Sequence, residues 1–95
     1  PSSSFALDAD LVVLALGFEP EPLPSIFGET GLDVTDWGTL EIDDRMMTTL
    51  PGVFAGGDIS RGASLVVWAV RDGRDVAEHI DAYLVAEREQ RAAAA

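Results

Sequence analysis

Residues 48–58 contain the side chains and glycine spacing best suited to chemistry in this chain. A short apolar run (53–55) is followed by Gly56, Gly57 and Asp58, and a helical pattern begins a few residues later. A strand that ends in two glycines lets the backbone come very close to a ligand. A nearby helix N-terminus offers unpaired amide N–H groups to a negatively charged or carbonyl oxygen, and Asp58 can accept hydrogen bonds from sugar-type hydroxyls. This combination predicts a nucleotide or flavin site.

Composition and charge restrict the classes of partner and site. The 95 residues amount to one domain or less, and because the sequence begins with Pro1 rather than methionine we expect a piece of a longer chain. Its 17 acidic residues against six arginines give a net charge of −11, which disfavours binding to nucleic acid or to a membrane. The sequence has no cysteine, so disulfides, thiolate metal sites and Cys-ligated iron–sulfur clusters are excluded within it. This absence fits a reducing compartment such as the cytoplasm.

The N-terminal third predicts a buried strand followed by a loop and a short helix. The continuous apolar run 11–16, ended by Gly17, is typical of a strand buried on both faces of a parallel α/β sheet, and a helix is the competing interpretation. Residues 1–4 are expected to be a flexible lead-in. Three prolines make residues 18–24 a loop, and a short helical turn is expected over residues 25–29.

The middle of the chain predicts short extended pieces, and the C-terminal third predicts a long helix. Residues 32–42 suit two extended pieces around a turn at 36–38, and residues 53–55 suit a further short strand. From Ser64 onward apolar residues recur at three- and four-residue spacings, as on one face of a helix. Residues 91–95 are expected to form a disordered tail. The order of these elements predicts an α/β fold in a single segment.

Several other residues could in principle take part in a functional site, but each also suits a simple structural role. His79 is a lone histidine on the predicted helix and is expected at the surface or in packing. Trp68 is expected in the helix core, with the lining of a flavin site as the alternative. Arg61, Arg71 and Arg74 either pair with nearby acids or contact a cofactor phosphate or a partner. No nucleophile–base pair and no cluster of metal ligands is visible in the sequence, so we expect no catalytic side chain and no metal site.

The order of residue types over the eleven positions 48–58 favours a functional interpretation of Gly57 and Asp58. Taken alone, a Gly-Gly-Asp triplet also suits a strand-end turn in which the aspartate caps a helix. The eleven positions, however, follow the order Thr, four variable residues, an aliphatic, an aromatic, Ala, any residue, Gly and Asp. This order resembles the second flavin-binding motif of the pyridine-nucleotide-dependent flavoprotein reductases.

The residues before and after this motif indicate a particular family within these flavoprotein reductases. Residues 58–77 are similar to the end of the small (beta) subunit of bacterial NADPH-dependent glutamate synthase, an outline shared by related electron-input domains such as that of dihydropyrimidine dehydrogenase. Residues 9–18 resemble that family's counterpart of the Ala-Thr-Gly strand motif. The resemblance covers about residues 5–84, with Gly56 standing where alanine is usual. It implies a partial, Rossmann-like FAD-binding domain, the C-terminal part of a member of the FAD/NAD(P)-dependent pyridine nucleotide-disulfide oxidoreductase superfamily.

The same resemblance implies a set of flavin-binding residues. Asp58 stands at the place of an aspartate that bonds a ribityl hydroxyl of FAD. Gly57 would let the backbone pass the flavin chain without a Cβ clash. The backbone amides of Ser64, Leu65 and Val66 would face the flavin pyrimidine edge, where a helix N-terminus stabilises the negative charge of reduced flavin.

The resemblance also implies cofactors and partners that this chain would share with other segments. No Gly-x-Gly-x-x-Gly is present, so the main phosphate cradles of FAD and NADPH, and the cysteines for iron–sulfur clusters, are expected upstream. The implied partners are the upstream part of the parent chain and the glutamate synthase large subunit, where glutamine and 2-oxoglutarate give glutamate. Two alternatives remain: a fragment of another FAD/NAD(P)-dependent reductase, or a non-catalytic module that forms homo-oligomers through an exposed apolar sheet edge and face.

Overall fold

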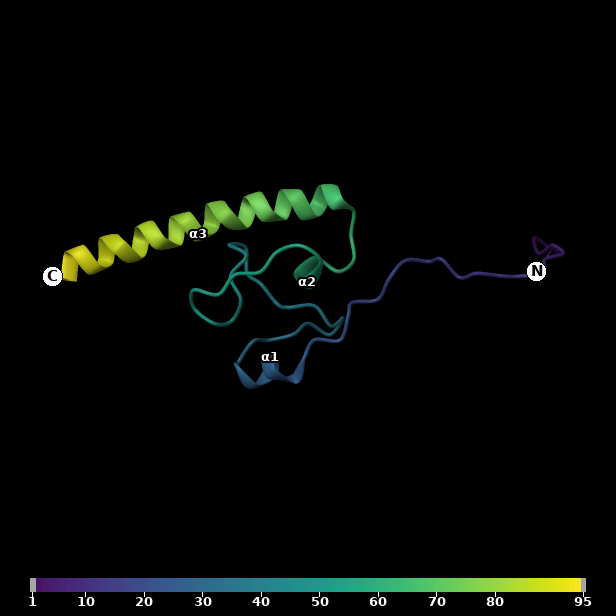
Figure 1. Cartoon of the computed structure of the whole chain (residues 1–95), viewed down its shortest axis with the longest axis horizontal. Helices are drawn as coiled ribbons and strands as arrows, with labels where there is room; N and C mark the ends of the chain where they lie inside the picture. The colour runs from purple at the N-terminus through teal and green to yellow at the C-terminus, as the bar shows by residue number, and fades with distance from the viewer. Residues whose placement is uncertain (1, 95) are drawn as a thin grey trace.

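The computed structural model describes residues 2–94 as an elongated chain with extents of 75 × 30 × 24 Å. Within this range lie three helices, α1 (Ser25–Glu29), α2 (Asp58–Arg61) and α3 (Val66–Ala94). Figure 1 shows an extended N-terminal segment at one end of the molecule and α3 reaching to the opposite end. Loops and the two short helices lie between them (Figure 1). None of the helices in this described range is long and apolar enough to cross a bilayer.

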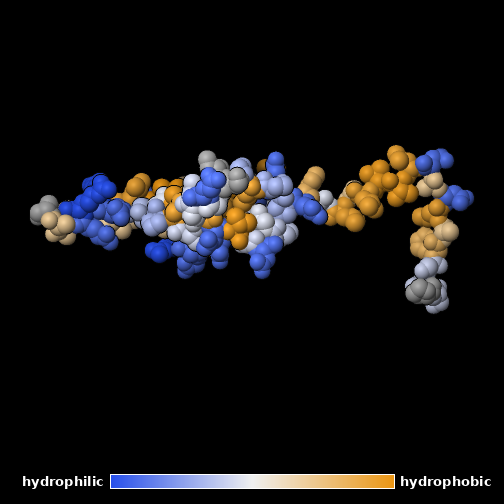
Figure 2. All heavy atoms as spheres, turned by 90° about the horizontal axis from the view of Figure 1, so that it is seen from below, coloured by the Kyte–Doolittle hydropathy of each residue, from blue (hydrophilic) through white to orange (hydrophobic). Residues whose placement is uncertain are grey.

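The N-terminal arm, defined here as residues 5–18, is extended and does not form the predicted buried strand. Leu11 and Leu14 are 81% and 82% exposed, and no strand pairing is found for the arm among residues 2–94. Figure 2 shows the arm as a hydrophobic stretch that stands apart from the body of the molecule. The burial predicted for residues 11–16 is therefore not confirmed, because a parallel strand needs neighbouring strands and covering helices that this chain does not supply.

Residues 32–57 form a loop body held by hydrogen bonds rather than by a sheet. The predicted turn at 36–38 is confirmed, since the amide of Gly38 donates to the carbonyl of Thr35 at 2.9 Å. The predicted strands are reduced to two isolated antiparallel bridges, between Val34 and Leu40 and between Met47 and Phe54. Buried residues in this body are few (Leu32, Thr39, Leu40 and Thr48). Local turns, and not a hydrophobic core, therefore determine its shape.

Helix α3 begins near the predicted position and packs on the loop body through a few contacts. The carbonyl of Leu65 accepts the amides of Trp68 and Ala69, so the helix starts one residue after Leu65. Along α3, Tyr83 packs edge-on against Phe54 with ring centroids 5.6 Å apart. The helix continues to Ala94, so residues 91–94 are helical where a disordered tail was expected, and residue 95 lies outside the described residues.

Candidate functional site

Gly57 lies at the turn that leads into α2 and has a backbone conformation restricted to glycine. Its φ of 82° and ψ of −154° fall in a region that residues with a Cβ essentially never occupy. The Gly57 amide donates to Asp72 Oδ2 at 3.1 Å, and its carbonyl accepts the amides of Ser60 and Arg61. A Cβ built on Gly57 meets no atom within 4 Å. The glycine is therefore required by backbone geometry, and the space beside it is open to a ligand.

Asp58 is the first residue of α2, and its carboxylate is available to a ligand. The side chain is exposed, and its carboxylate has no hydrogen-bond or ion-pair partner among residues 2–94. It borders a cavity of about 450 Å³, which is within the usual size range of small-molecule sites. The cavity is lined by Glu19, Pro20, Glu21, Pro22, Leu23, Pro24, Gly38, Asp58, Ile59 and Ala63.

The three predicted amide donors lie at the start of α3. Val66 is the first helical residue, so its amide and the next one have no intrahelical acceptor. The Ser64 hydroxyl donates to the carbonyl of Gly62 at 2.9 Å and does not cap α3. Leu65 and Val66 are 71% and 77% exposed. These residues do not border the cavity beside Asp58, so the structure brings only part of the predicted site to that cavity.

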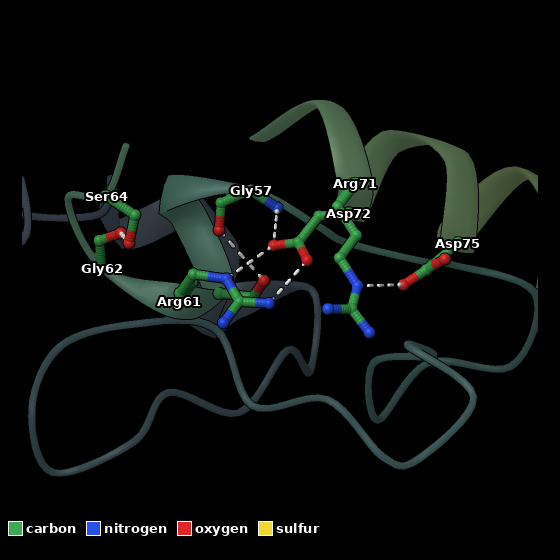
Figure 3. A network of polar contacts seen from close by, with 8 residues as sticks. Gly57, Arg61, Gly62, Ser64, Arg71, Asp72 and Asp75 are labelled. Atoms are coloured by element: carbon green, nitrogen blue, oxygen red, sulfur yellow. Dashed lines mark hydrogen bonds and ion pairs between the residues drawn. The ribbon is translucent and has the colours of Figure 1, made fainter. Parts of the chain in front are cut away.

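A charged pair that sequence reasoning did not assign fixes the turn to α3. Arg61, the last residue of α2, donates from Nε to Asp72 Oδ2 at 2.9 Å and from Nη2 to Asp72 Oδ1 at 2.6 Å. Figure 3 shows the Asp72 carboxylate facing both the Arg61 guanidinium and the Gly57 amide. Asp72 is only 3% exposed. Of the two roles left open for Arg61, pairing with a local acid is the one found in the structure.

The electrostatics of this pair favour the ionised carboxylate. The hydrogen bond from the Arg61 side chain lowers the pKa of Asp72, the desolvation of the buried carboxylate opposes this change, and the Gly57 amide lowers the pKa further. The same hydrogen bond, which Asp72 accepts, raises the pKa of Arg61. Asp72 therefore stays charged at neutral pH and acts as a fixed acceptor between helix and turn.

Aromatic side chains pack beside the pair. The Arg61 guanidinium carbon lies 4.6 Å from the centroid of a Trp68 ring, and that of Arg71 lies 5.6 Å from it. Trp68 is 40% exposed, so it is not the core residue that helical periodicity predicted. Trp37 packs on the far end of α2, where a Cβ on Gly62 would come within 3.1 Å of its ring. Aromatic surfaces therefore hold both Arg61 and Gly62.

His79 lies on α3 near the same pair and is half-buried, which agrees with the packing role expected for it. It borders a second cavity of about 370 Å³ that also includes Asp72 and Arg61. Asp72 itself carried no signal in the sequence. It lies inside a regular helix, and its partners are 11 and 15 residues earlier, across a turn with no periodicity.

Comparisons with known proteins agree with the family expected from residues 48–58. Residues 2–73 match the family described as pyridine nucleotide-disulphide oxidoreductase. The chain is 64% identical over 88 residues to the glutamate synthase [NADPH] small chain of Azospirillum brasilense, covering 92% of this chain and 18% of that protein. The small chain of Mycobacterium tuberculosis H37Rv is 42% identical over 83 residues, covering 87% and 17%.

A relative with a different name has a similar level of identity. The Escherichia coli K12 protein AegA, provisionally named an oxidoreductase, is 43% identical over 82 residues, covering 82% of this chain and 12% of its own. The chain thus spans less than a fifth of the length of these relatives. The expected similarity to the glutamate synthase small chain is confirmed. Because the family match extends over most of the sequence, the chain belongs to the pyridine nucleotide-disulphide oxidoreductase family.

Proposed function

We propose that this chain completes the FAD site of an NADPH-dependent oxidoreductase, the small chain of glutamate synthase. The observation that carries the proposal is that Gly57, in a glycine-only conformation with open space beside it, precedes Asp58, whose carboxylate has no partner among residues 2–94. The similarity to two glutamate synthase small chains over most of this chain supports the choice of enzyme.

The residues present fit a flavin. Asp58 would accept hydrogen bonds from ribityl hydroxyls, because its carboxylate is exposed and borders a cavity. Gly57 would allow the flavin chain to approach the backbone, since no side chain occupies the space beside it. The amides of Ser64, Leu65 and Val66 would donate to the pyrimidine edge and stabilise negative charge there. FAD supplies the electron-transfer chemistry when bound, and the chain binds and orients it without a catalytic side chain.

The N-terminal arm would join a larger Rossmann-like sheet in the complete protein. Its apolar residues are exposed in this chain, and a run of this kind is stable only when both faces are covered. The upstream part of the same protein would supply the neighbouring strands, the phosphate cradles for FAD and NADPH, and the cysteines of iron–sulfur clusters. Electrons would then pass from NADPH through FAD and the clusters to the large subunit, in the cytoplasm, for glutamate synthesis.

Two alternative functions are each supported by a separate observation. The similarity to AegA favours a general FAD/NAD(P)-dependent reductase as the second candidate. The exposed arm favours self-association as the behaviour of the isolated chain. Iron–sulfur cysteines in the segment preceding residue 1 would favour glutamate synthase over another reductase. A stable monomer across a concentration series in light scattering would count against self-association.

The test uses the A. brasilense small chain with its matching segment replaced by this chain, referred to below as the chimera. Asp58→Asn in the chimera should weaken FAD binding by at least about tenfold, because hydrogen bonds to a charged group contribute about 1.5–3 kcal/mol. Asp81→Asn, a change of an exposed aspartate on α3, is the matched control. Bound flavin is measured by visible absorbance after dialysis. Equal FAD affinity in the two variants would sink the assignment of Asp58.

A direct titration of the unmodified chain with FAD accompanies this test. Because the main phosphate cradle is expected upstream, we expect no saturable binding to the chain alone. Saturable binding with a perturbed flavin spectrum would show that residues 1–95 hold enough of the site by themselves.

A further inference from the structure

We propose that Arg61 and Asp72 are positioning residues of the flavin site, which fix the Gly57–Asp58 turn to α3. This inference rests on the proposed function and assigns it two residues that do not touch the flavin. It would make the carboxylate of Asp72 the link between two groups of flavin contacts, the acceptor Asp58 on one side and the donor amides at the start of α3 on the other.

Gly57 has an unusual backbone conformation that glycine can adopt without a side-chain clash, and contacts with other residues select it from the many that glycine can adopt. The Gly57 amide is held by Asp72 Oδ2 at 3.1 Å, and the Gly57 carbonyl is held by the amides of Ser60 at 3.1 Å and Arg61 at 2.9 Å. The carbonyl contacts lie within α2 and its cap, so they move with the turn. Asp72 is the contact that ties the Gly57 amide to α3.

Asp72 supplies the acceptor oxygens for these contacts. Its two oxygens accept three hydrogen bonds, two from Arg61 and one from the Gly57 amide. A neutral asparagine keeps one acceptor oxygen, which can serve the Gly57 amide and Arg61 Nε, but it loses the charge and places an NH₂ group where Arg61 Nη2 needs an acceptor. The carboxylate is buried and its ionised form is favoured, which makes these contacts stronger than those of an exposed pair. The geometry therefore needs the charge and both oxygens.

Helix α2 is fixed at both ends. Gly62, with φ of 87°, donates its amide to the carbonyl of Asp58 at 2.9 Å and packs against Trp37. Arg61 lies over Trp68, a residue in the first turn of α3. Arg61 thus contacts α3 twice, through Asp72 and through Trp68, and Figure 3 shows α2 and α3 joined at this point. A shift of Asp72 would therefore move Asp58 relative to the start of α3.

The experiment compares four variants in the chimera by FAD affinity and by the reduction potential of the bound flavin. Asp72→Asn should raise the FAD dissociation constant at least about tenfold, because hydrogen bonds to a charged group are lost. It should also lower the potential, since misplaced amides stabilise reduced flavin less well. Asp75→Asn is the matched control. Its pair with Arg71 is exposed and 3.7 Å long, and its loss should change affinity by less than about threefold.

The remaining two variants separate positioning from simple cross-linking. The double variant Arg61→Asp/Asp72→Arg restores an ion pair but removes the acceptor of the Gly57 amide, so it should not restore affinity or potential. Recovery of both in this double variant would overturn the proposal, because the pair would then act only as a cross-link. Arg61→Lys keeps the charge and loses the second hydrogen bond, so it should lie between wild type and Asp72→Asn.

Failure of the inference and failure of the proposed function give different results. If Asp58→Asn loses FAD but Asp72→Asn behaves like Asp75→Asn, the positioning role is wrong and the flavin site stands. If Asp58→Asn has no effect, the flavin site itself is wrong, and the positioning role is overturned with it. Should Asp72→Asn not fold, Arg61→Lys carries the same comparison, and a potential equal to wild type in that variant would overturn the proposal.

Discussion

The N-terminal arm and the turn at residues 57–62 contrast in what determines their conformation. The arm has the strongest apolar run in the sequence, yet it is exposed and unpaired among the described residues. The turn is polar and rich in glycine, yet each of its constrained positions is held by hydrogen bonds or aromatic contacts. Strand burial depends on distant partners, whereas the hydrogen bonds of the turn span at most 19 residues, from Ile59 to Leu40. Local bonding can therefore specify the conformation of this turn even though residues 2–94 contain no sheet.

The largest effect is expected for a charge placed in the arm. Leu14→Asp in the chimera should prevent stable folding, because an unpaired charge on a strand buried on both faces costs several kcal/mol. In the 95-residue chain the same change should alter stability by less than about 0.5 kcal/mol, since Leu14 is 82% exposed. Thermal unfolding of both proteins measures the difference. A chimera that tolerates Leu14→Asp would show that the arm is not buried in the larger protein, and the arm and the turn would then not differ in their need for distant partners.

The second effect concerns the glycine-only conformation in the turn. Gly57→Ala should destabilise the chimera by about 1–3 kcal/mol, because alanine cannot adopt this φ and ψ without strain. Gly73→Ala is the matched control, since a Cβ at either glycine meets no atom within 4 Å and Gly73 lies inside α3. The control should be stabilising by about 0.5–1 kcal/mol. Urea unfolding measures both, and equal effects of the two changes would contradict the assigned backbone conformation.

Sequence reasoning predicted the parts of the molecule that depend on near neighbours. It placed the short helix at residues 25–29, the turn at 36–38 and the start of the long helix within two residues of Val66. It also singled out Gly57 and Asp58, because glycine and carboxylate types at fixed spacing have direct chemical meaning.

The parts that it did not predict depend on contacts across the chain. The run 11–16 predicted a buried strand, but its residues are exposed and pair with no strand among residues 2–94. Asp72 received no role, because its position in a regular helix looks like an ordinary polar site until the fold brings Gly57 and Arg61 beside it. Trp68 fits helical periodicity, yet it stacks on Arg61 instead of entering a core.

A smaller effect on the stability of the turn is expected when the pH is lowered. The pKa of Asp72 is lower in the folded state than in the unfolded state, chiefly because of Arg61, so its ionised form favours folding. This contribution is present above the ordinary aspartate pKa of about 3.9 and is lost as pH falls through the lowered native value. The NMR shift of the Gly57 amide should therefore stay constant from neutral pH to about pH 4 and change below it.

The control for acid sensitivity is Asp72→Asn, in which the shift of the Gly57 amide should no longer respond to this titration. Asp43 gives an internal comparison, because the amides of Met47 and Arg45 lower its pKa at an exposed position. A Gly57 shift that titrates identically in wild type and Asp72→Asn would show that Asp72 is not its acceptor in solution.

The smallest effect is expected at the pair of Arg71 and Asp75, close along α3 to the pair that Arg61 forms with the buried Asp72. Arg71→Gln should change stability by less than about 0.5 kcal/mol, because Arg71 is exposed, Asp75 is half-exposed and the N–O distance is 3.7 Å. Arg61→Gln should have a clearly larger effect, since it removes two hydrogen bonds to a buried carboxylate. Thermal unfolding of the chimera at low and high salt measures both. If Arg71→Gln and Arg61→Gln destabilised the chimera equally, the burial of Asp72 would not make its ion pair with Arg61 stronger than the pair of Arg71 and Asp75. That ion pair would then give the turn no firmer conformation than the arm has.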